Sequence, residues 1–151
     1  MIKKNNSAEW EILNNADAII FGSPAYMGGV ADDFKKNADL SSKIWYEAKW
    51  KNKIAGGFTN SRRLNADKFI TIQYLWTLAM QHAMIWVSLG IFHASKKSST
   101  TADINYMGGF AGALAVSLSD SSAEEAGHTG DLETAKLYGK RIAQITQQFN
   151  K

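Results

Sequence analysis

Four short apolar segments set the pattern of the chain, at residues 18–22, 53–59, 84–90 and 113–118. The first and third are nearly continuous in apolar character and do not alternate with polar positions. Strands of this kind are buried on both faces, as in a parallel sheet that helices cover on either side. The pattern therefore predicts a parallel sheet.

Helical periodicity separates and follows these segments. Residues 67–83 carry apolar side chains at steps of three and four, with Asn65 available as N-cap, and residues 131–149 do the same, with Asp131 near the positive helix end. The predicted apolar faces are Phe69, Ile72, Trp76, Ala79 and Ala83, and Leu132, Ala135, Tyr138, Ile142, Ile145 and Phe149. Shorter helices are expected at residues 8–15 and 30–40. This alternation predicts a single doubly wound α/β domain over residues 1–151.

Composition excludes several classes of protein. The 151 residues include no Cys, which excludes disulfides and thiolate metal sites. Lys and Arg number 17 against 14 Asp and Glu, a net charge of +3 that is spread along the chain, so we expect no nucleic-acid partner. The apolar runs are too short to span a membrane and no apolar leader precedes them, so we expect a cytoplasmic protein.

Two unusual segments follow the first two predicted strands, where ligands of a doubly wound sheet bind. Residues 23–29 hold the one Pro, a Gly pair and an aromatic residue beside a Met, whereas residues 59–65 are rich in hydroxyl, amide and guanidinium groups. We expect the two segments to lie side by side and to suit a flat ring with an anionic tail. Both are also compatible with ordinary strand-to-helix turns.

Three segments occur in a specific order: residues 13–29 (LNNADAIIFGSPAYMGG), 57–61 (GFTNS) and 80–87 (MQHAMIWV). This order resembles the flavodoxin-like NAD(P)H:quinone oxidoreductases and NADPH-dependent FMN reductases, over nearly the whole chain. The resemblance implies a flavodoxin-like fold, with FMN and NAD(P)H as cofactors.

The same resemblance implies roles for individual residues. The flavin ring would contact Ser23, Pro24, Ala25, Tyr26, Met27 and Gly28, and its pyrimidine side and ribityl chain would contact Thr59, Asn60, Ser61, Arg62, Arg63 and Leu64. Trp45 would close the flavin pocket, often from a neighbouring subunit, and His82 would be the catalytic histidine at the reactive flavin edge.

Two features depart from that family. Its members begin with a strand, a phosphate-binding loop, a helix and a second strand, whereas this chain opens at Met1 just before the next helix. The expectation is an N-terminally shortened fold in which the FMN phosphate is poorly anchored. In addition, Arg62 and Arg63 stand where the family has small residues. These cations would stabilise charge at flavin N1–O2, bind a nicotinamide phosphate, or obstruct the ring.

Structural alternatives exist for three of the candidate side chains. His82 would pack at a helix C-terminus, Trp45 would join Trp50 in a subunit contact without cofactor, and Tyr26 would face solvent. No carboxylate pair or Ser-His-Asp order supports hydrolase chemistry.

Two functions of different classes are therefore predicted. One is an FMN-dependent oxidoreductase that passes two electrons from NAD(P)H to a quinone or similar acceptor, with His82 and Trp45 at the same pocket. The alternative is a shortened oligomeric or binding module without tightly bound flavin. In both, the apolar edge of residues 18–21 predicts a homo-oligomer, dimer or tetramer, in which a second copy, the exchanged residues 1–15 or a partner covers this edge.

Overall fold

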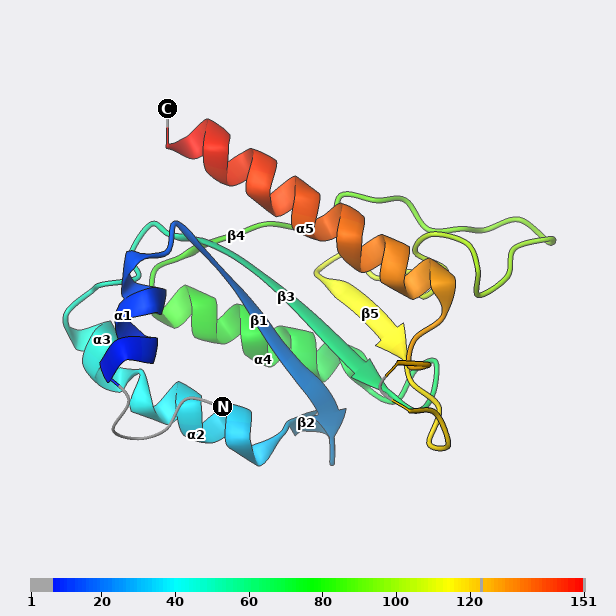
Figure 1. The fold of residues 1–151 in the computed structure, drawn as a ribbon, viewed down its shortest axis with the longest axis horizontal. Coiled ribbons are helices and arrows are strands. Elements are labelled where there is room, and N and C mark those ends of the chain that lie inside the picture. Colours follow the sequence, from blue (N-terminus) through cyan, green and yellow to red (C-terminus); the bar gives the residue numbers. More distant parts are fainter. Residues whose placement is uncertain (1–6, 123, 151) are drawn as a thin grey trace.

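The computed structural model describes residues 7–122 and 124–150, which fold as helices packed on both faces of a mostly parallel sheet (Figure 1). The elements in chain order are α1 (Ser7–Asn15), β1 (Ala18–Tyr26), β2 (Gly29–Val30), α2 (Asp32–Leu40), α3 (Ser42–Tyr46), β3 (Ile54–Ser61), α4 (Lys68–Gln81), β4 (Ile85–Trp86), β5 (Ala113–Val116) and α5 (Thr129–Phe149). The order confirms the predicted α/β fold. None of the described helices is long and apolar enough to cross a membrane.

β3 is the strand with the most neighbours. β1 lies parallel to it on one flank, in register from Ala18 opposite Ile54 to Pro24 opposite Asn60. On the other flank, β4 pairs with the beginning of β3 and β5 with its end. The chain therefore leaves this edge after β4, makes an excursion over residues 87–112 and returns to complete the same edge.

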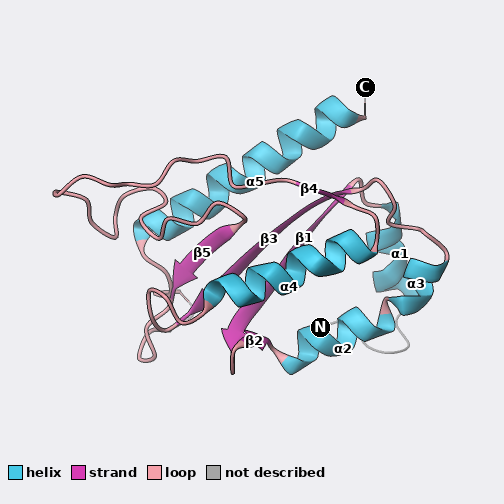
Figure 2. Ribbon diagram, turned by 180° about the vertical axis from the view of Figure 1, so that it is seen from behind, coloured by secondary structure: helices cyan, strands magenta, loops and turns pink. Residues whose placement is uncertain are grey.

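Two consecutive glycines let helices approach both faces of β3. A Cβ on Gly56 would lie 2.5 Å from Ile142 Cδ1 of α5, and a Cβ on Gly57 would lie 3.2 Å from Leu75 Cδ1 of α4. Because neighbouring strand residues point to opposite faces, α4 and α5 cover opposite sides of the sheet. Figure 2 shows α4 crossing in front of β1 and β3.

Each face carries its own apolar core. The core under α4 comprises Ile19, Phe21, Ile44, Trp50, Ala55, Ile72, Leu75, Ala79 and Met84, and the core under α5 comprises Ile54, Val87, Leu89, Ala113, Tyr138 and Ile142. Trp50 is buried in the first core, and its indole N–H donates to Asn14 Oδ1 at 3.0 Å. The alternative in which Trp50 forms a subunit contact therefore does not hold, because this side chain is buried within one chain.

The inner face of α4 differs from its predicted apolar face. Phe69 and Trp76 are exposed, whereas Lys68 and Thr71 are buried. Both polar side chains have partners inside: the Thr71 hydroxyl donates to the Gly29 carbonyl at 3.0 Å, and the Lys68 ammonium donates to loop carbonyls. The predicted face was wrong because the periodicity counted only apolar residues, whereas the buried face of α4 also includes Lys68 and Thr71.

The predicted element ends also differ from the structure. The N-cap of α4 is Asp67, in a left-handed conformation with φ 53°, and not Asn65. In α5, Leu132 and Phe149 are exposed, whereas Asp131 is buried and accepts the Val116 backbone N–H at 3.0 Å. The polar first turn of α5 thus faces the sheet, and the predicted apolar face is buried only in the middle of the helix.

The short helix α3 was not predicted.

Tyr138→Phe is expected to lower the free energy of unfolding by about 1–3 kcal/mol. The buried Tyr138 hydroxyl donates to the Val87 carbonyl at 2.6 Å and accepts the Gly57 N–H at 3.3 Å, so its removal leaves two buried backbone groups unpaired. Burial raises the pKa of Tyr138 to about 12, which keeps the hydroxyl protonated as a donor. Denaturant unfolding measures the effect. The exposed Tyr46→Phe is the control, and equal stability of both variants would contradict the assignment.

Candidate functional site

The two predicted site segments lie side by side at the carboxyl ends of β1 and β3. Ser23 is opposite Thr59 and Pro24 is opposite Asn60 in the parallel register. Both strands run further than predicted, so residues 23–26 and 59–61 end the strands and only the residues after them form loops. The predicted adjacency of the segments is confirmed.

The first segment combines a fixed interior residue with an open outer surface. Ser23 is buried, and its hydroxyl donates to the Pro24 carbonyl and accepts the Ala31 N–H, both at 3.0 Å. Ser23 therefore has a structural role, since its hydroxyl joins two parts of the backbone. Tyr26 and Met27, in contrast, are exposed, and the exposed fraction of Met27 is 92%. Gly28, at φ +79°, has no atom within 4 Å of the place of a Cβ. A flat ring can lie against this backbone without displacing a side chain.

The second segment divides in the same way. Thr59 is 1% exposed, and its hydroxyl oxygen has no hydrogen-bond partner in the described part of the chain. Asn60 Nδ2 donates to Ser117 Oγ at 2.9 Å, and the Ser61 hydroxyl donates to the Arg63 carbonyl at 3.2 Å. The outer surface belongs to the next three residues: Arg62, Arg63 and Leu64 are exposed.

A buried lysine beneath this loop was not found by sequence reasoning. Lys68 is 1% exposed, and its ammonium donates to the Arg63 carbonyl and, at 3.0 Å, to the Leu64 carbonyl. Burial lowers the pKa of Lys68, and the charge of Asp131 opposes that shift. The available signal was a Lys one turn after the loop, on the side of the helix that continues as Thr71, Ile72 and Leu75.

His82 and Trp45 lie at the other end of the sheet. His82 directly precedes Ala83, whose carbonyl accepts the Asn52 N–H at 2.9 Å just before β3 begins. Trp45 is 51% exposed on α3, which Figure 1 shows beside α1 and away from β2. Within one chain, the structure does not bring either residue to the segments at the carboxyl ends, because the length of the strands separates them.

The surroundings of His82 define its tautomer. His82 is 4% exposed, its ring centroid lies 4.4 Å from that of Trp50, and its Nε2 lies 2.9 Å from Ser41 Oγ. The Ser41 hydroxyl donates to the Ala38 carbonyl at 2.7 Å, so Nε2–H of His82 is the donor to Ser41. Nδ1 is then unprotonated, and it is buried without a partner among the described residues. Burial lowers the pKa of His82.

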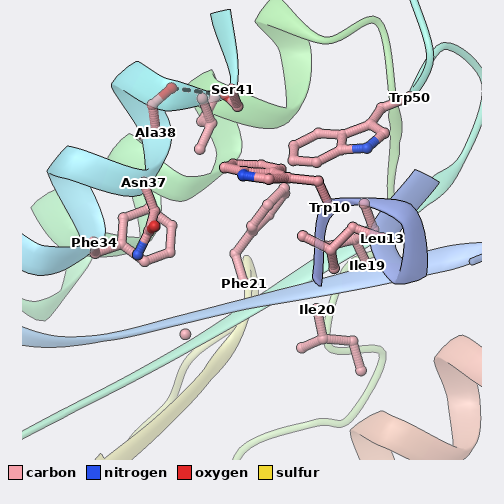
Figure 3. Close-up of a pocket in the computed structure, with 12 residues that line it drawn as sticks. Trp10, Leu13, Ile19, Ile20, Phe21, Phe34, Asn37, Ala38, Ser41 and Trp50 are labelled. Atoms are coloured by element: carbon pink, nitrogen blue, oxygen red, sulfur yellow. Dashed lines mark hydrogen bonds between the residues drawn. The ribbon is translucent and has the colours of Figure 1, made fainter. Parts of the chain in front are cut away.

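An apolar hollow of about 260 Å³ lies between α1, α2 and β1 (Figure 3). Trp10 and Trp50 form its aromatic wall, with ring centroids 6.3 Å apart, and Phe21 points into it from β1. Ile20 points to the opposite side of the strand. Neither His82 nor Trp45 lines the hollow, but Ser41 and Trp50 do, and both of these side chains contact His82.

The stability of the chain is expected to fall as the pH drops below about 6.5, and His82→Gln is expected to reduce this fall. The pKa of His82 is lower in the folded chain than its ordinary value of 6.5, so the unfolded chain binds the proton first and the free energy of unfolding decreases. Gln keeps a donor for Ser41 but does not titrate. Unfolding at pH 5–7 measures the slope, with the exposed His93→Gln as control. An unchanged slope for His82→Gln would exclude this origin.

Comparisons with known proteins bear on the family to which the chain belongs. No protein-family model matches the chain. Flavodoxin FldP of Pseudomonas aeruginosa is 49% identical over 143 residues, which cover 95% of this chain and 77% of FldP. An NAD(P)H dehydrogenase (quinone) of Archaeoglobus fulgidus is 26% identical over 92% of this chain, and the match spans 64% of its own length.

A solved structure extends this similarity to three dimensions. The crystal structure of a WrbA-like flavodoxin from Agrobacterium tumefaciens matches with a TM-score of 0.72 and 44% identity, over 95% of this chain and 74% of that one. The parallel sheet between helical layers and the identity to FldP together show that the chain belongs to the flavodoxin family.

Proposed function

We propose that the chain acts as an FMN-dependent oxidoreductase, in which NAD(P)H is the electron donor and a quinone or similar small molecule is the acceptor. The observation that supports this best is the adjacency of residues 23–28 and 59–64 at the carboxyl ends of β1 and β3. Parallel sheets of this type bind ligands at that end. Relatives named as flavodoxin and as quinone dehydrogenases support the same class of chemistry.

The residues present fit the ring of FMN. The Gly28 backbone is open, and the exposed Tyr26 and Met27 offer apolar surface beside it. Leu64 is exposed on the other segment. Together these groups present an apolar surface bordered by backbone groups, which suits a flat heteroaromatic ring.

FMN, when bound between these two segments, would supply the two-electron hydride chemistry that links NAD(P)H oxidation to quinone reduction, and solvent would supply the one proton that each hydroquinone also needs. The chain orients the ring through its two segments, and Arg62 and Arg63 place positive charge beside it. His82 has no part in this proposal, because it is buried at the far end of the sheet. Trp45 is exposed and is proposed to close the pocket of a neighbouring copy.

A homo-oligomer is part of the same proposal. One flank of β1 pairs with β3, but along residues 18–24 the other flank pairs with no described strand. No charged residue interrupts β1, and Ile20 is exposed on it. Such an edge is a template for another strand, and a second copy that pairs by two-fold symmetry would cover it.

FMN added to the purified chain is expected to bind with quenching of flavin fluorescence, and Tyr26→Ala is expected to weaken binding by about tenfold, the loss of one aromatic contact. Phe149→Ala is the matched control, because Phe149 is an exposed aromatic residue at the far end of α5. A chain that is indifferent to FMN would favour the alternative, a flavodoxin-like binding module. If both variants weakened FMN binding equally, Tyr26 would not be part of the flavin site.

Light scattering at micromolar concentration is expected to give a multiple of the 16.6 kDa chain mass. Ile20→Lys is expected to shift the population to monomer, because a charge on the strand edge opposes strand pairing. Leu132→Lys, on the exposed side of α5, is the control and is expected to leave the mass unchanged. A monomeric unsubstituted chain would refute the oligomer and leave FMN binding to be judged separately.

A further inference from the structure

We propose that the first turn of α4 positions both site segments for the flavin ring, with Thr71 holding the segment at residues 23–29 and Lys68 holding the segment at residues 59–64. The inference rests on the proposed oxidoreductase function and names two positioning residues for it. Three observations carry it: the hydrogen bonds of the two side chains, their burial, and the exposure of the segments that they hold.

One face of α4 reaches both segments. Lys68 and Thr71 lie three residues apart in the first turn of the helix, so they share a face. The Lys68 ammonium donates to the Arg63 carbonyl and, at 3.0 Å, to the Leu64 carbonyl. The Thr71 hydroxyl donates to the Gly29 carbonyl at 3.0 Å. Figure 2 shows this end of α4 near the carboxyl ends of β1 and β3. A single helical turn is therefore bonded to both segments.

Both tethers lie in the interior of the chain. Lys68 is 1% exposed and Thr71 is fully buried. An ammonium group has three donors and no acceptor, and its burial costs free energy unless the donors are paired. Two of the Lys68 donors pair with carbonyls of the loop, and the negative charge of Asp131 attracts the ammonium. Because water competes little with hydrogen bonds in the interior, these bonds fix the backbone that they reach.

The segments themselves are exposed and short. The first is the end of a hairpin, in which Ala25 pairs with Val30 and Tyr26 with Gly29. A two-stranded hairpin is marginally stable by itself. In the second, residues 62–67 join β3 to α4 without forming a strand or helix, and Leu64 is exposed. The positions of both segments therefore depend on bonds to the body of the chain, and Lys68 and Thr71 supply them from one rigid helix.

This arrangement fixes the spacing of the segments before a ligand binds. A flat ring that contacts the outer surface of both segments needs them at one separation, and segments that are already ordered lose less conformational entropy on binding. Neither Lys68 nor Thr71 has to touch the ring, because each acts through the backbone that accepts its hydrogen bond. Loss of either tether frees one segment and leaves the other in place.

The first test compares Thr71→Val with Thr71→Ser. Val keeps the shape of Thr but has no hydroxyl, so FMN binding is expected to weaken by about tenfold, the effect of losing one buried hydrogen bond. The visible circular dichroism of bound FMN is expected to change as well, because the ring lies between segments of altered spacing. Ser keeps the hydroxyl and is expected to stay within about threefold of the unsubstituted affinity. Thr77→Val is the matched control, since the Thr77 hydroxyl donates only within α4, to the Gln73 carbonyl at 2.7 Å.

The second test compares Lys68→Met with Lys68→Arg. Met removes both hydrogen bonds to the loop and is expected to weaken FMN binding by at least about tenfold. Arg keeps the donors, and the cavity of about 470 Å³ that Lys68 lines leaves room for the larger guanidinium, so Arg is expected to restore most of the affinity. Lys140→Met, on the exposed side of α5, is the control for loss of a positive charge. If Lys68→Met does not fold, the Thr71 pair decides.

A third test needs no flavin. In the flavin-free chain, Lys68→Met is expected to speed tryptic cleavage after the exposed Arg62 and Arg63 by about tenfold, relative to cleavage after the exposed Lys96 and Lys97. Lys68→Met is expected to leave chymotryptic cleavage after Tyr26 unchanged. Thr71→Val is expected to do the reverse, with cleavage after the exposed Phe92 as the reference. Cleavage thus reports which segment each tether holds.

Several results would overturn the proposal. One is unchanged cleavage of both segments in both variants. Another is unchanged FMN affinity in variants whose segments are cleaved faster, which would leave the proposed oxidoreductase function intact. Equal effects of Thr71→Val, Thr71→Ser and Thr77→Val would also overturn it, because general destabilisation would then explain them. If the unsubstituted chain does not bind FMN, the oxidoreductase function fails, and the cleavage pattern alone supports or overturns the tethers.

Discussion

The parallel pairing of β1 with β3 is the constraint on which the rest of the structure depends. Seven register pairs, from Ala18 opposite Ile54 to Pro24 opposite Asn60, bring two chain segments about 35 residues apart into contact. This register places Ser23 beside Thr59, so both strands end at the same level and both site segments leave the sheet together. A slip of one residue would turn Ile19 and Phe21 out of the core under α4. The site and the core are therefore fixed by the same hydrogen-bond ladder.

Much of the fold could be predicted from the sequence because burial leaves a periodic trace. The continuous apolar run of residues 18–22 indicated a buried parallel strand, whereas the similar run of residues 84–90 forms only the two-residue strand β4. The steps between Tyr138, Ile142 and Ile145 indicated the inner side of α5. The adjacency of the two site segments followed from strand direction alone. The inner side of α4 could not be predicted, because Lys68 and Thr71 are polar and their partners, the carbonyls of Arg63, Leu64 and Gly29, come from tertiary structure.

The placement of His82 shows a second limit of sequence reasoning. A histidine at the end of an amphipathic helix fits a flavin contact and a packing role equally well when the residue is considered alone. The role implied by the resemblance did not take into account that a helix between two parallel strands ends at the amino ends of those strands. In the structure, α4 runs back along the sheet and ends where Asn52 meets Ala83, so His82 joins Ser41 and Trp50. Trp50, which lies beside Lys49 in the sequence and was considered as a surface contact, packs against His82 and belongs to the core under α4.

The excursion between β4 and β5 is a connection whose sequence can vary independently of the pairing of the two strands. β4 and β5 occupy successive stretches of one edge of β3, so the sheet is complete whatever connects them. Lengthening a connection costs only about 0.6 kcal/mol per doubling of its length. The residues around Tyr106 and Met107 can consequently diverge while the ladder that holds residues 23–24 beside residues 59–60 stays unchanged. Selection can thus change this part of the surface without altering how the sheet folds.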